Sequence, residues 1–212
     1  MKTTVLIGAS GLIGNYLLEK LLAESSYQNV IILVRRLLPI QHPKLQQIVV
    51  DFNDVSILKQ YTKGEDLFIC TGTTIKKAGS QAAFKAIDFD LPLQIATIAS
   101  KNKMKRLFMV SALGADSTSS IFYSKIKGEL EDSISKLNFQ TIVFFQPSLL
   151  LGDRKEFRFW EKVSQIIFPL FDIFLIGKLK KYRAIHANEV AHRMIHESLK
   201  NEIGVRKILF HL

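Results

Sequence analysis

Three glycines at intervals of three residues join an apolar run to a helical pattern near the start of the chain. The run Thr3–Ile7 predicts a strand, and Leu12–Ala23 has the apolar spacing of a helix. Gly8, Gly11 and Gly14 lie at the junction. Glycine weakens regular elements, so its repeated use here needs a physical reason. Glycine is required for a tight turn, for a close backbone approach to a ligand, and for close helix–sheet packing. The helix N-terminus would then offer free N–H groups to a pyrophosphate.

The spacing G-x-x-G-x-x-G is one residue longer than the Rossmann fingerprint G-x-G-x-x-G. Its position after a strand and before a helix makes it a stronger signal than glycines alone. We therefore expect a dinucleotide to bind here, with a glycine-rich turn that holds no ligand as the alternative. The residues expected to line the cofactor in this segment are Gly8, Ser10, Gly11, Leu12, Ile13 and Gly14.

Strand-like and helix-like patterns alternate from the start of the chain to Gln146. The expected strands are Thr3–Ile7, Val30–Val34, Leu45–Phe52, Asp66–Cys70, Arg106–Ser111 and Thr141–Gln146. The expected helices are Leu12–Ala23, Asp54–Tyr61, Ala82–Lys101 with a kink at Pro92, and Ile121–Lys136. Such alternation predicts an α/β fold, a Rossmann-type doubly wound parallel sheet with helices on both faces.

The alternation breaks after Pro147. We expect helices at Phe157–Phe171 and Asn188–Lys200 and a closing strand at Lys207–Leu212. The whole chain, 1–212, is predicted to be a single domain in which residues 149–207 contribute a small substrate region. The apolar run Ile166–Ile176 is too short to span a bilayer, so we expect no transmembrane segment. A pocket lining or a subunit contact is the expected role of this run, with weak membrane-surface contact as the alternative.

Charge and cysteine content narrow the partners. The chain has 29 Lys and Arg against 19 Asp and Glu, a net charge of +10, which suits an anionic partner. The basic residues form no long stripe with aromatic residues between them, so we expect no nucleic-acid partner. A single cysteine, Cys70, excludes an internal disulfide and fits a reducing, cytoplasmic location. His192 and His196 lack an evident third ligand, so no metal site is expected. A monomer or a homodimer is expected.

The end of the second expected strand bears on cofactor choice. An acid at this position selects NAD, whereas an arginine accommodates the 2′-phosphate of NADP. The chain has Arg35 and Arg36 there and no acid. Guanidinium groups bind phosphate in a bidentate manner, so NADP(H) is favoured over NAD(H), with ordinary loop charges as the alternative. Asp51 and Phe52, at the end of the third strand, are expected near the adenine, although an Asp there is also a common turn residue.

Three residues suit proton transfer during hydride chemistry. Ser111 closes the fifth expected strand, at the sheet edge where ligands bind in such folds. Tyr123 and Lys127 are four residues apart in a helical pattern and so share a face. Tyr123 would be the general acid/base, with its pKa lowered by Lys127. Lys127 could also hold the nicotinamide ribose, and Ser111 would hydrogen-bond the substrate oxygen.

These glycines, together with Ser111, Tyr123 and Lys127, resemble the short-chain dehydrogenase/reductase superfamily. The stretches "CTGTT", "SALGAD", "FYSKIKGELE" and "QPSLLLGDR" are similar to its atypical members, in particular the Tat-interacting oxidoreductase subgroup and its bacterial relatives. The resemblance implies a Rossmann fold that binds NADP(H). It further implies cofactor contacts from Thr71, Gly72, Thr73, Pro147 and Ser148. Because atypical members often keep the cofactor site without a defined substrate, the resemblance allows two functions.

The first expected function is an NADP(H)-dependent oxidoreductase that transfers a hydride to or from a small carbonyl or alcohol substrate. The second is a non-catalytic NADP(H)-binding regulatory or redox-sensing protein. Only 64 residues follow Ser148, which weakens a sugar-nucleotide epimerase interpretation.

Overall fold

The computed structural model describes residues 2–151 and 184–210. Its strands are β1 (Lys2–Ile7), β2 (Tyr27–Val34), β3 (Leu45–Val49), β4 (Asp66–Ile69), β5 (Arg106–Val110), β6 (Thr141–Gln146), β7 (Leu150–Leu151), β8 (Ile185–His186) and β9 (Gly204–Leu209). Its helices are α1 (Leu12–Ala23), α2 (Val55–Tyr61), α3 (Ile75–Ala78), α4 (Gln81–Lys85), the π-helical segment η1 (Ala86–Asp90), α5 (Leu91–Lys101), α6 (Phe122–Ser135) and α8 (Ala187–Ser198).

Seven strands form one parallel sheet in the order β3-β2-β1-β4-β5-β6-β9. The chain runs outward from β1 to β3 and then crosses back to place β4 on the other side of β1. This reversal creates the crevice in which open α/β sheets bind ligands, at the carboxyl ends of β1 and β4. A separate pair of two-residue strands, β7 and β8, lies outside the main sheet. The expected doubly wound parallel sheet is confirmed.

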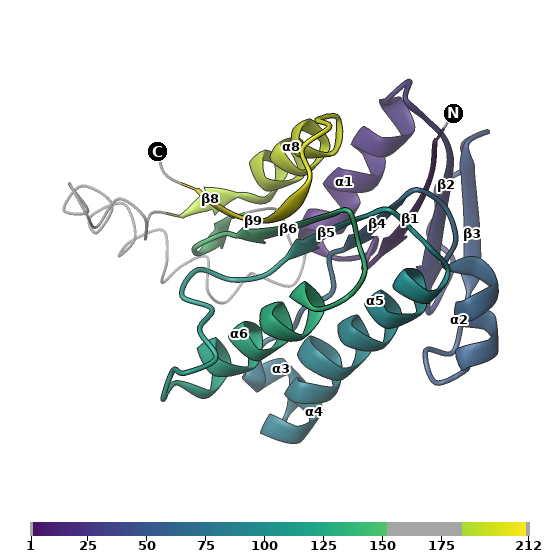
Figure 1. The fold of residues 1–212 in the computed structure, drawn as a ribbon. Helices are drawn as coiled ribbons and strands as arrows, with labels where there is room; N and C mark the ends of the chain where they lie inside the picture. The colour runs from purple at the N-terminus through teal and green to yellow at the C-terminus, as the bar shows by residue number, and fades with distance from the viewer. Residues whose placement is uncertain (1, 152–183, 211–212) are drawn as a thin grey trace.

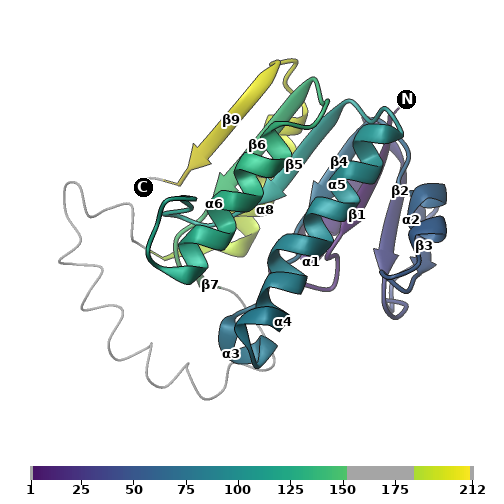
Figure 2. The ribbon, with the colours of Figure 1, turned by 60° about the horizontal axis from the view of Figure 1, so that its bottom comes forward.

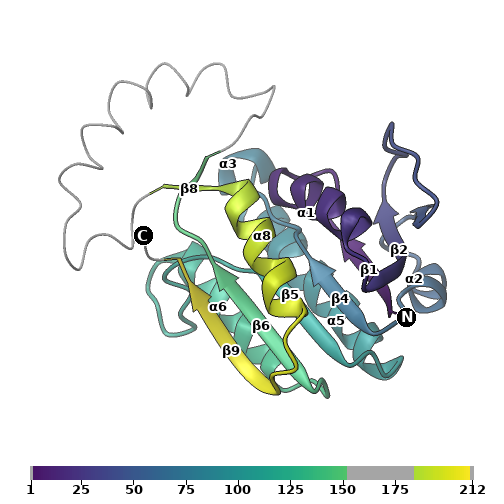
Figure 3. The ribbon, with the colours of Figure 1, turned by 90° about the horizontal axis from the view of Figure 1, so that it is seen from above.

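Helices cover the sheet on both faces (Figure 1). One face carries α1 and α8, which pack side by side and stand in front of the sheet in Figure 3. The other face carries α2, α5 and α6, and Figure 2 shows α5 and α6 running along it. Because successive strand residues point to opposite faces, β5 sends Phe108 into one core and Leu107 into the other.

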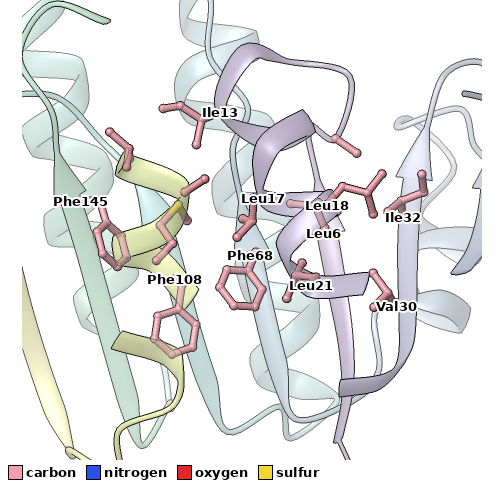
Figure 4. Packing of buried hydrophobic residues seen from close by; sticks show 14 of the residues in the cluster. Leu6, Ile13, Leu17, Leu18, Leu21, Val30, Ile32, Phe68, Phe108 and Phe145 are labelled. Atoms are coloured by element: carbon pink, nitrogen blue, oxygen red, sulfur yellow. The ribbon is translucent and has the colours of Figure 1, made fainter. Parts of the chain in front are cut away.

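The core under α1 and α8 is built from leucines and aromatic rings (Figure 4). Leu17, Leu18 and Leu21 project from α1 onto the sheet, as their helical spacing predicts. The rings of Phe68 and Phe108 stack with centroids 5.0 Å apart. The burial of these side chains fixes the position of α1, and with it the turn at the carboxyl end of β1.

Several expected boundaries differ from the structure for identifiable reasons. The second strand begins at Tyr27, not Val30, because the Tyr27 hydroxyl is anchored to Asp66 on β4. The third strand ends at Val49, before Phe52, since Asp51 accepts hydrogen bonds from Asn53 and starts a turn. Asp54 then caps α2 by accepting from the backbone N–H groups of Ser56 and Ile57.

The expected long helix at Ala82–Lys101 is three consecutive pieces. It begins as α4, widens into the π-helical segment η1 at Ala86–Asp90, and continues as α5. Pro92, which has no N–H to donate, lies in the first turn of α5, directly after the wide segment. The helix at Asn188–Lys200 begins one residue earlier, at Ala187, and ends at Ser198, and the closing strand begins at Gly204 instead of Lys207.

Two sequence predictions concern residues that the structure does not describe. The helix at Phe157–Phe171 and the apolar run Ile166–Ile176 both lie outside the described residues. Within the described parts of 149–207, α8 packs on α1 and β9 joins the main sheet beside β6. Among the described residues, no helix combines the length and apolarity needed to cross a bilayer.

A buried polar network closes the amino-terminal edge of the sheet. Asp66, at the start of β4, has no exposed surface and accepts a hydrogen bond of 2.5 Å from the Tyr27 hydroxyl. The same carboxylate accepts from Nε and Nη2 of the Arg106 guanidinium, and Nη1 donates to the Lys200 carbonyl. All the charges in this network are compensated, so the network joins β2, β4 and β5 at the edge opposite the ligand crevice.

Ion pairs hold the outer strand β9 from both faces of the sheet. Arg206 reaches Glu197 on α8 at 2.8 Å, and the neighbouring Lys207 reaches Glu131 on α6 at 2.8 Å. Both glutamate side chains are fully buried. Burial opposes ionisation of Glu197, but the hydrogen bonds from Lys200 and Arg206 outweigh it and lower its pKa below the usual range.

Candidate active site

The glycine turn is sterically closed to larger residues at two positions. Gly8 has φ of +85°, and a Cβ there would lie 2.6 Å from the backbone carbonyl carbon of Cys70 on the neighbouring strand segment. A Cβ on Gly14 would lie 2.1 Å from the Gly8 carbonyl oxygen. Gly11, the N-cap of α1, has more room and donates to the Gly8 carbonyl at 2.9 Å. The three glycines thus draw β1, β4 and α1 together at the switch point.

The first turn of α1 offers its backbone and not its side chains to the crevice. Ile13 is buried in the core under α1 and α8 (Figure 4), and Leu12 is partly buried against the same core. The N–H groups of a helix's first turn have no partner within the helix. Backbone donors without intervening side chains, at the positive end of the helix dipole, are suited to a pyrophosphate. This part of the chain therefore fits the phosphates of a dinucleotide.

Beside this turn lies a surface hollow of about 580 Å³. It is lined by Ser10, Val34, Arg35, Arg36, Leu37 and Leu38. Both arginines are exposed, and none of the six lining residues is acidic. A hollow that joins the glycine turn to two guanidinium groups suits an adenosine ribose that carries a phosphate. Asp51 and Phe52 do not line it: Asp51 is exposed in its turn, and Phe52 packs partly against the core.

Unpartnered buried oxygens mark the crevice at the ends of β4 and β5. The hydroxyl of Thr71 follows β4, and the hydroxyl of Ser111 follows β5; neither has a hydrogen-bond partner among the described residues. Ser111 is only 5% exposed, and its backbone N–H donates to the Phe145 carbonyl at 2.7 Å. Buried hydroxyls are normally partnered, and these two lie on the edge where open α/β sheets bind ligands.

Tyr123 and Lys127 lie on α6, one turn apart, as predicted. Lys127 is 5% exposed, and Tyr123 is half-buried with its ring 5.6 Å from that of Phe84. Burial raises the pKa of Tyr123 above its ordinary value; Lys127 opposes this rise, and Asp88 adds to it. The expected net lowering of the tyrosine pKa is therefore wrong for this structure, because burial and a second charge outweigh the lysine.

Asp88 is the site residue that the sequence analysis missed. Its carboxylate lies 2.6 Å from the Lys127 ammonium and accepts a hydrogen bond of 2.8 Å from the Thr73 backbone N–H. Gly72, which is exposed, passes beside the same carboxylate. The signal in the sequence is an acid on an apolar helical face, since Phe84 and Pro92, four residues to either side of Asp88, are also buried.

The loop after Ser111 is held against α6 by a second missed residue. A Cβ on Gly128 would lie 2.1 Å from the Ser117 backbone nitrogen, so only glycine lets this loop approach the helix beside Lys127. The Asp116 N–H also donates to the Ser124 carbonyl at 3.1 Å. The loop that begins with Ser111 is thereby held against the helix that carries the tyrosine and the lysine.

The remaining predicted residues lie around this edge. Pro147 lies directly after β6 and is buried. Its carbonyl accepts a hydrogen bond of 2.9 Å from the Leu113 N–H. This bond connects the segment that contains Ser148 to the loop that begins with Ser111. Burial raises the pKa of the Cys70 thiol, which argues against a reactive thiolate. His192 and His196 are exposed, and the described ranges contain no group of three side chains able to hold a metal.

Comparison with known proteins agrees with this geometry. The family model described as NAD(P)H-binding matches residues 8–136, from the first glycine of the turn to the end of α6. The chain belongs to this NAD(P)H-binding family. Its relatives include Protein HTATIP2 of Rattus norvegicus, which is 34% identical over 79% of this chain and 70% of that protein. The mitochondrial protein FMP52 of Candida albicans is 34% identical over 73% of this chain and 69% of that protein.

Solved structures of low sequence identity show the same NAD(P)-binding fold. MoeE5 in complex with UDP-glucose and NAD has a TM-score of 0.72 at 14% identity, covering 99% of this chain and 76% of that one. WbmH of Bordetella bronchiseptica in complex with NAD+ has a TM-score of 0.72 at 13% identity, covering 99% and 75%. The predicted NAD(P)-binding Rossmann family, with HTATIP2 among its members, is confirmed.

Proposed function

We propose that the protein is an NADP(H)-dependent oxidoreductase for a small carbonyl or alcohol substrate. One observation carries the proposal: Ser111, Tyr123 and Lys127 lie at the same carboxyl edge of the sheet as the glycine turn of an NAD(P)H-binding family member. The unpartnered Ser111 hydroxyl and the buried lysine support the proposal, because a reacting oxygen needs polar groups of this kind.

The residues divide the chemistry between them. NADPH supplies a hydride to the carbonyl carbon in the reductive direction. Tyr123 gives its proton to the carbonyl oxygen and is reprotonated from solvent, while Ser111 donates a hydrogen bond to that oxygen. Lys127 keeps a positive charge near the tyrosine and would hold the nicotinamide ribose. Tyr123 holds its proton at neutral pH, and its raised pKa makes it a weaker acid than a free tyrosine.

Preference for NADP(H) rests on Arg35 and Arg36 in the hollow beside the glycine turn. The test is calorimetric titration of NADPH and NADH into the parent protein and into an Arg35→Ala/Arg36→Ala variant. We expect NADPH affinity to fall about 10- to 100-fold, as loss of charge-assisted hydrogen bonds predicts, with NADH affinity unchanged. A Lys101→Ala/Lys136→Ala variant, which removes two exposed cations far from the hollow, is the control. Equal affinities of the parent for both nucleotides would contradict the preference.

Turnover is tested with a panel of small aldehydes and ketones, by following NADPH absorbance. Tyr123→Phe removes only the hydroxyl, and we expect at least a 100-fold loss of kcat with NADPH affinity retained. Asp132→Asn, which changes an exposed acid on the same helix, is the matched control. A Tyr123→Phe variant that turns over any substrate as fast as the parent would rule out the assigned role.

A second candidate function is a cofactor-binding regulator without turnover. The observation in its favour is that the pKa of Tyr123 is raised, not lowered, so the residue resists ionisation. Under this alternative the parent binds NADPH, reduces nothing in the panel, and changes its protease sensitivity or partner binding when NADPH is added. NADPH oxidation that depends on Tyr123 would exclude it.

Further expectations stay proposals. We propose that residues 149–207 contribute to substrate selection within one Rossmann domain and that the protein is a monomer or homodimer. A cytoplasmic location also stays a prediction, and the FMP52 relatives are named as mitochondrial. Sedimentation velocity of the purified protein and imaging of a tagged copy in cells would test the oligomeric state and the location.

A further inference from the structure

A buried carboxylate that the proposed reaction does not use lies beside its lysine. The Asp88 side chain is 1% exposed, and one oxygen lies 2.6 Å from the Lys127 ammonium. Its other oxygen accepts from the Thr73 N–H at 2.8 Å. A single carboxyl group therefore joins α6 to the segment after β4, where the cofactor contacts are predicted.

The placement of Asp88 is costly unless it serves a purpose. It belongs to the π-helical segment η1, on a helix face otherwise made of buried apolar residues such as Phe84 and Ile95. Burying a charge is unfavourable without full pairing, and replacing both Asp88 and Lys127 by apolar residues would avoid that cost. Single π-helical turns inside α-helices are frequently found at functional sites. The wide turn, the ion pair and the Thr73 contact coincide at one residue.

We propose that Asp88 is a positioning residue of the candidate active site, which fixes Lys127 relative to the cofactor-facing segment and offsets the charge that Lys127 presents to Tyr123. The inference rests on the proposed function. Three groups face Tyr123: Lys127 from its own helix, Asp88 from η1, and the uncharged ring of Phe84 from α4. With the ammonium neutralised by a carboxylate, burial controls the tyrosine, and its proton is retained for donation to a carbonyl oxygen.

The first experiment measures the ionisation of Tyr123 itself. Ultraviolet titration near 295 nm is recorded for the protein with and without Tyr123→Phe, and the difference isolates this tyrosine. In Asp88→Asn we expect its titration midpoint to fall by about one pH unit, since the ammonium then acts unopposed. Asp90→Asn, which alters an exposed acid two residues further along, leaves the midpoint in place. An unchanged or higher midpoint in Asp88→Asn overturns the proposal.

The second experiment separates local positioning from general damage. NADPH reaches the lysine end of the crevice, whereas adenosine 2′,5′-bisphosphate ends at the glycine turn and the arginines. We expect Asp88→Asn to lower the affinity for NADPH by about tenfold and to change the affinity for the bisphosphate by no more than about twofold. Equal losses for both ligands, or no loss for either, contradict a positioning role. If the parent binds neither ligand, the proposed function fails, while the tyrosine titration still decides the effect of Asp88.

The Asp88→Asn variant leaves the buried Lys127 unpaired, which favours misfolding. A double variant therefore provides a second test. Asp88→Asn/Lys127→Met removes both charges, a change that buried ion pairs tolerate better than loss of one partner. If the two charges offset each other, the Tyr123 midpoint of the double variant stays within about half a unit of the parent. A clear rise, as expected from loss of the lysine alone, would show that Asp88 never acted on the tyrosine.

Discussion

The two ends of strand β4 carry opposite kinds of polar chemistry. At its amino end, Asp66 is fully buried and bonded to Tyr27 and Arg106, which leaves its charge compensated. After its carboxyl end, the buried Thr71 hydroxyl has no partner among the described residues, and the Ser111 hydroxyl on the adjacent strand is in the same situation. The Asp66 network at one end is fully paired, whereas the Thr71 and Ser111 hydroxyls at the other end are open.

From this difference we predict which polar residues stabilise the fold and which are available to bind a ligand. A buried group that is satisfied by the protein contributes through the native state alone. A buried group left open costs stability until something binds it, and such residues persist where binding is selected. Changes at the amino edge should therefore alter unfolding without altering cofactor affinity, and changes at the carboxyl edge should do the reverse.

The largest effect is expected at the amino edge. Asp66→Asn removes the negative partner of Arg106, whose guanidinium is only 11% exposed, and leaves that charge uncompensated. We expect the free energy of unfolding to fall by about 3–5 kcal/mol, as measured by urea denaturation. NADPH affinity of the protein that remains folded should be unchanged. A loss of affinity comparable to the loss of stability would break the division between the two edges.

A smaller effect on stability, joined to a loss of binding, is expected at Gly14. The added methyl group of Gly14→Ala would meet the Gly8 carbonyl oxygen and push α1 away from the turn. Overpacking of this kind lowers the free energy of unfolding by about 1–3 kcal/mol. Displacement of the backbone amides should also lower the affinity for NADPH severely. Urea denaturation and calorimetry on the same sample measure both quantities. Gly79→Ala is an instructive contrast, since a Cβ there meets nothing within 4 Å, although its φ of +84° still strains alanine.

Alkaline pH should reveal the amino-edge network through Tyr27. Burial first, and then Asp66, raise the pKa of Tyr27 above its unfolded value near 10. Above that pH the unfolded chain loses the proton and the folded protein keeps it, so stability falls as pH rises. The slope for one such group is about 1.4 kcal/mol per pH unit. Tyr27→Phe should be less stable near neutrality yet show a shallower decline above pH 10, and parallel curves for both proteins would refute this account.

The smallest change in stability is expected at the open edge. Ser111→Ala deletes a hydroxyl that has no partner among the described residues, so the free energy of unfolding should shift by less than about 0.5 kcal/mol. Thr141→Val is the matched comparison, because that hydroxyl donates to the Glu202 carbonyl at 2.7 Å, and its loss should cost about 1 kcal/mol. If turnover is found, Ser111→Ala should abolish most of it despite its normal stability.

Much of the fold could be predicted because its signals are local. Thr141–Gln146 and Leu12–Ala23 occupy their predicted bounds, since continuous apolar runs and helical spacing are encoded over a few residues. The glycine turn was predictable for the same reason. The start of β2 was not, because Tyr27 is placed by Asp66, 39 residues away in the sequence.

The candidate site was predictable in its residue types and not in its electrostatics. Ser111, Tyr123 and Lys127 lie at the expected edge, yet the Tyr123 pKa is raised by burial first and then by Asp88, which lies on a different helix. Gly128 escaped notice because its role is a close approach of the loop at Ser117, which no spacing within α6 reveals. Contacts between segments distant in sequence decide these properties, and one sequence does not display them.

The ion pairs of β9 have a consequence for how the chain folds during synthesis. Among the described strands, this one is translated last, and it brings the cations that face Glu131 and Glu197 on opposite layers. A growing polypeptide that has assembled β1 to β6 holds Glu131 without Lys207, and α8 then brings Glu197 before Arg206 is made. We therefore expect the two helical layers to be joined through β9 only late in synthesis.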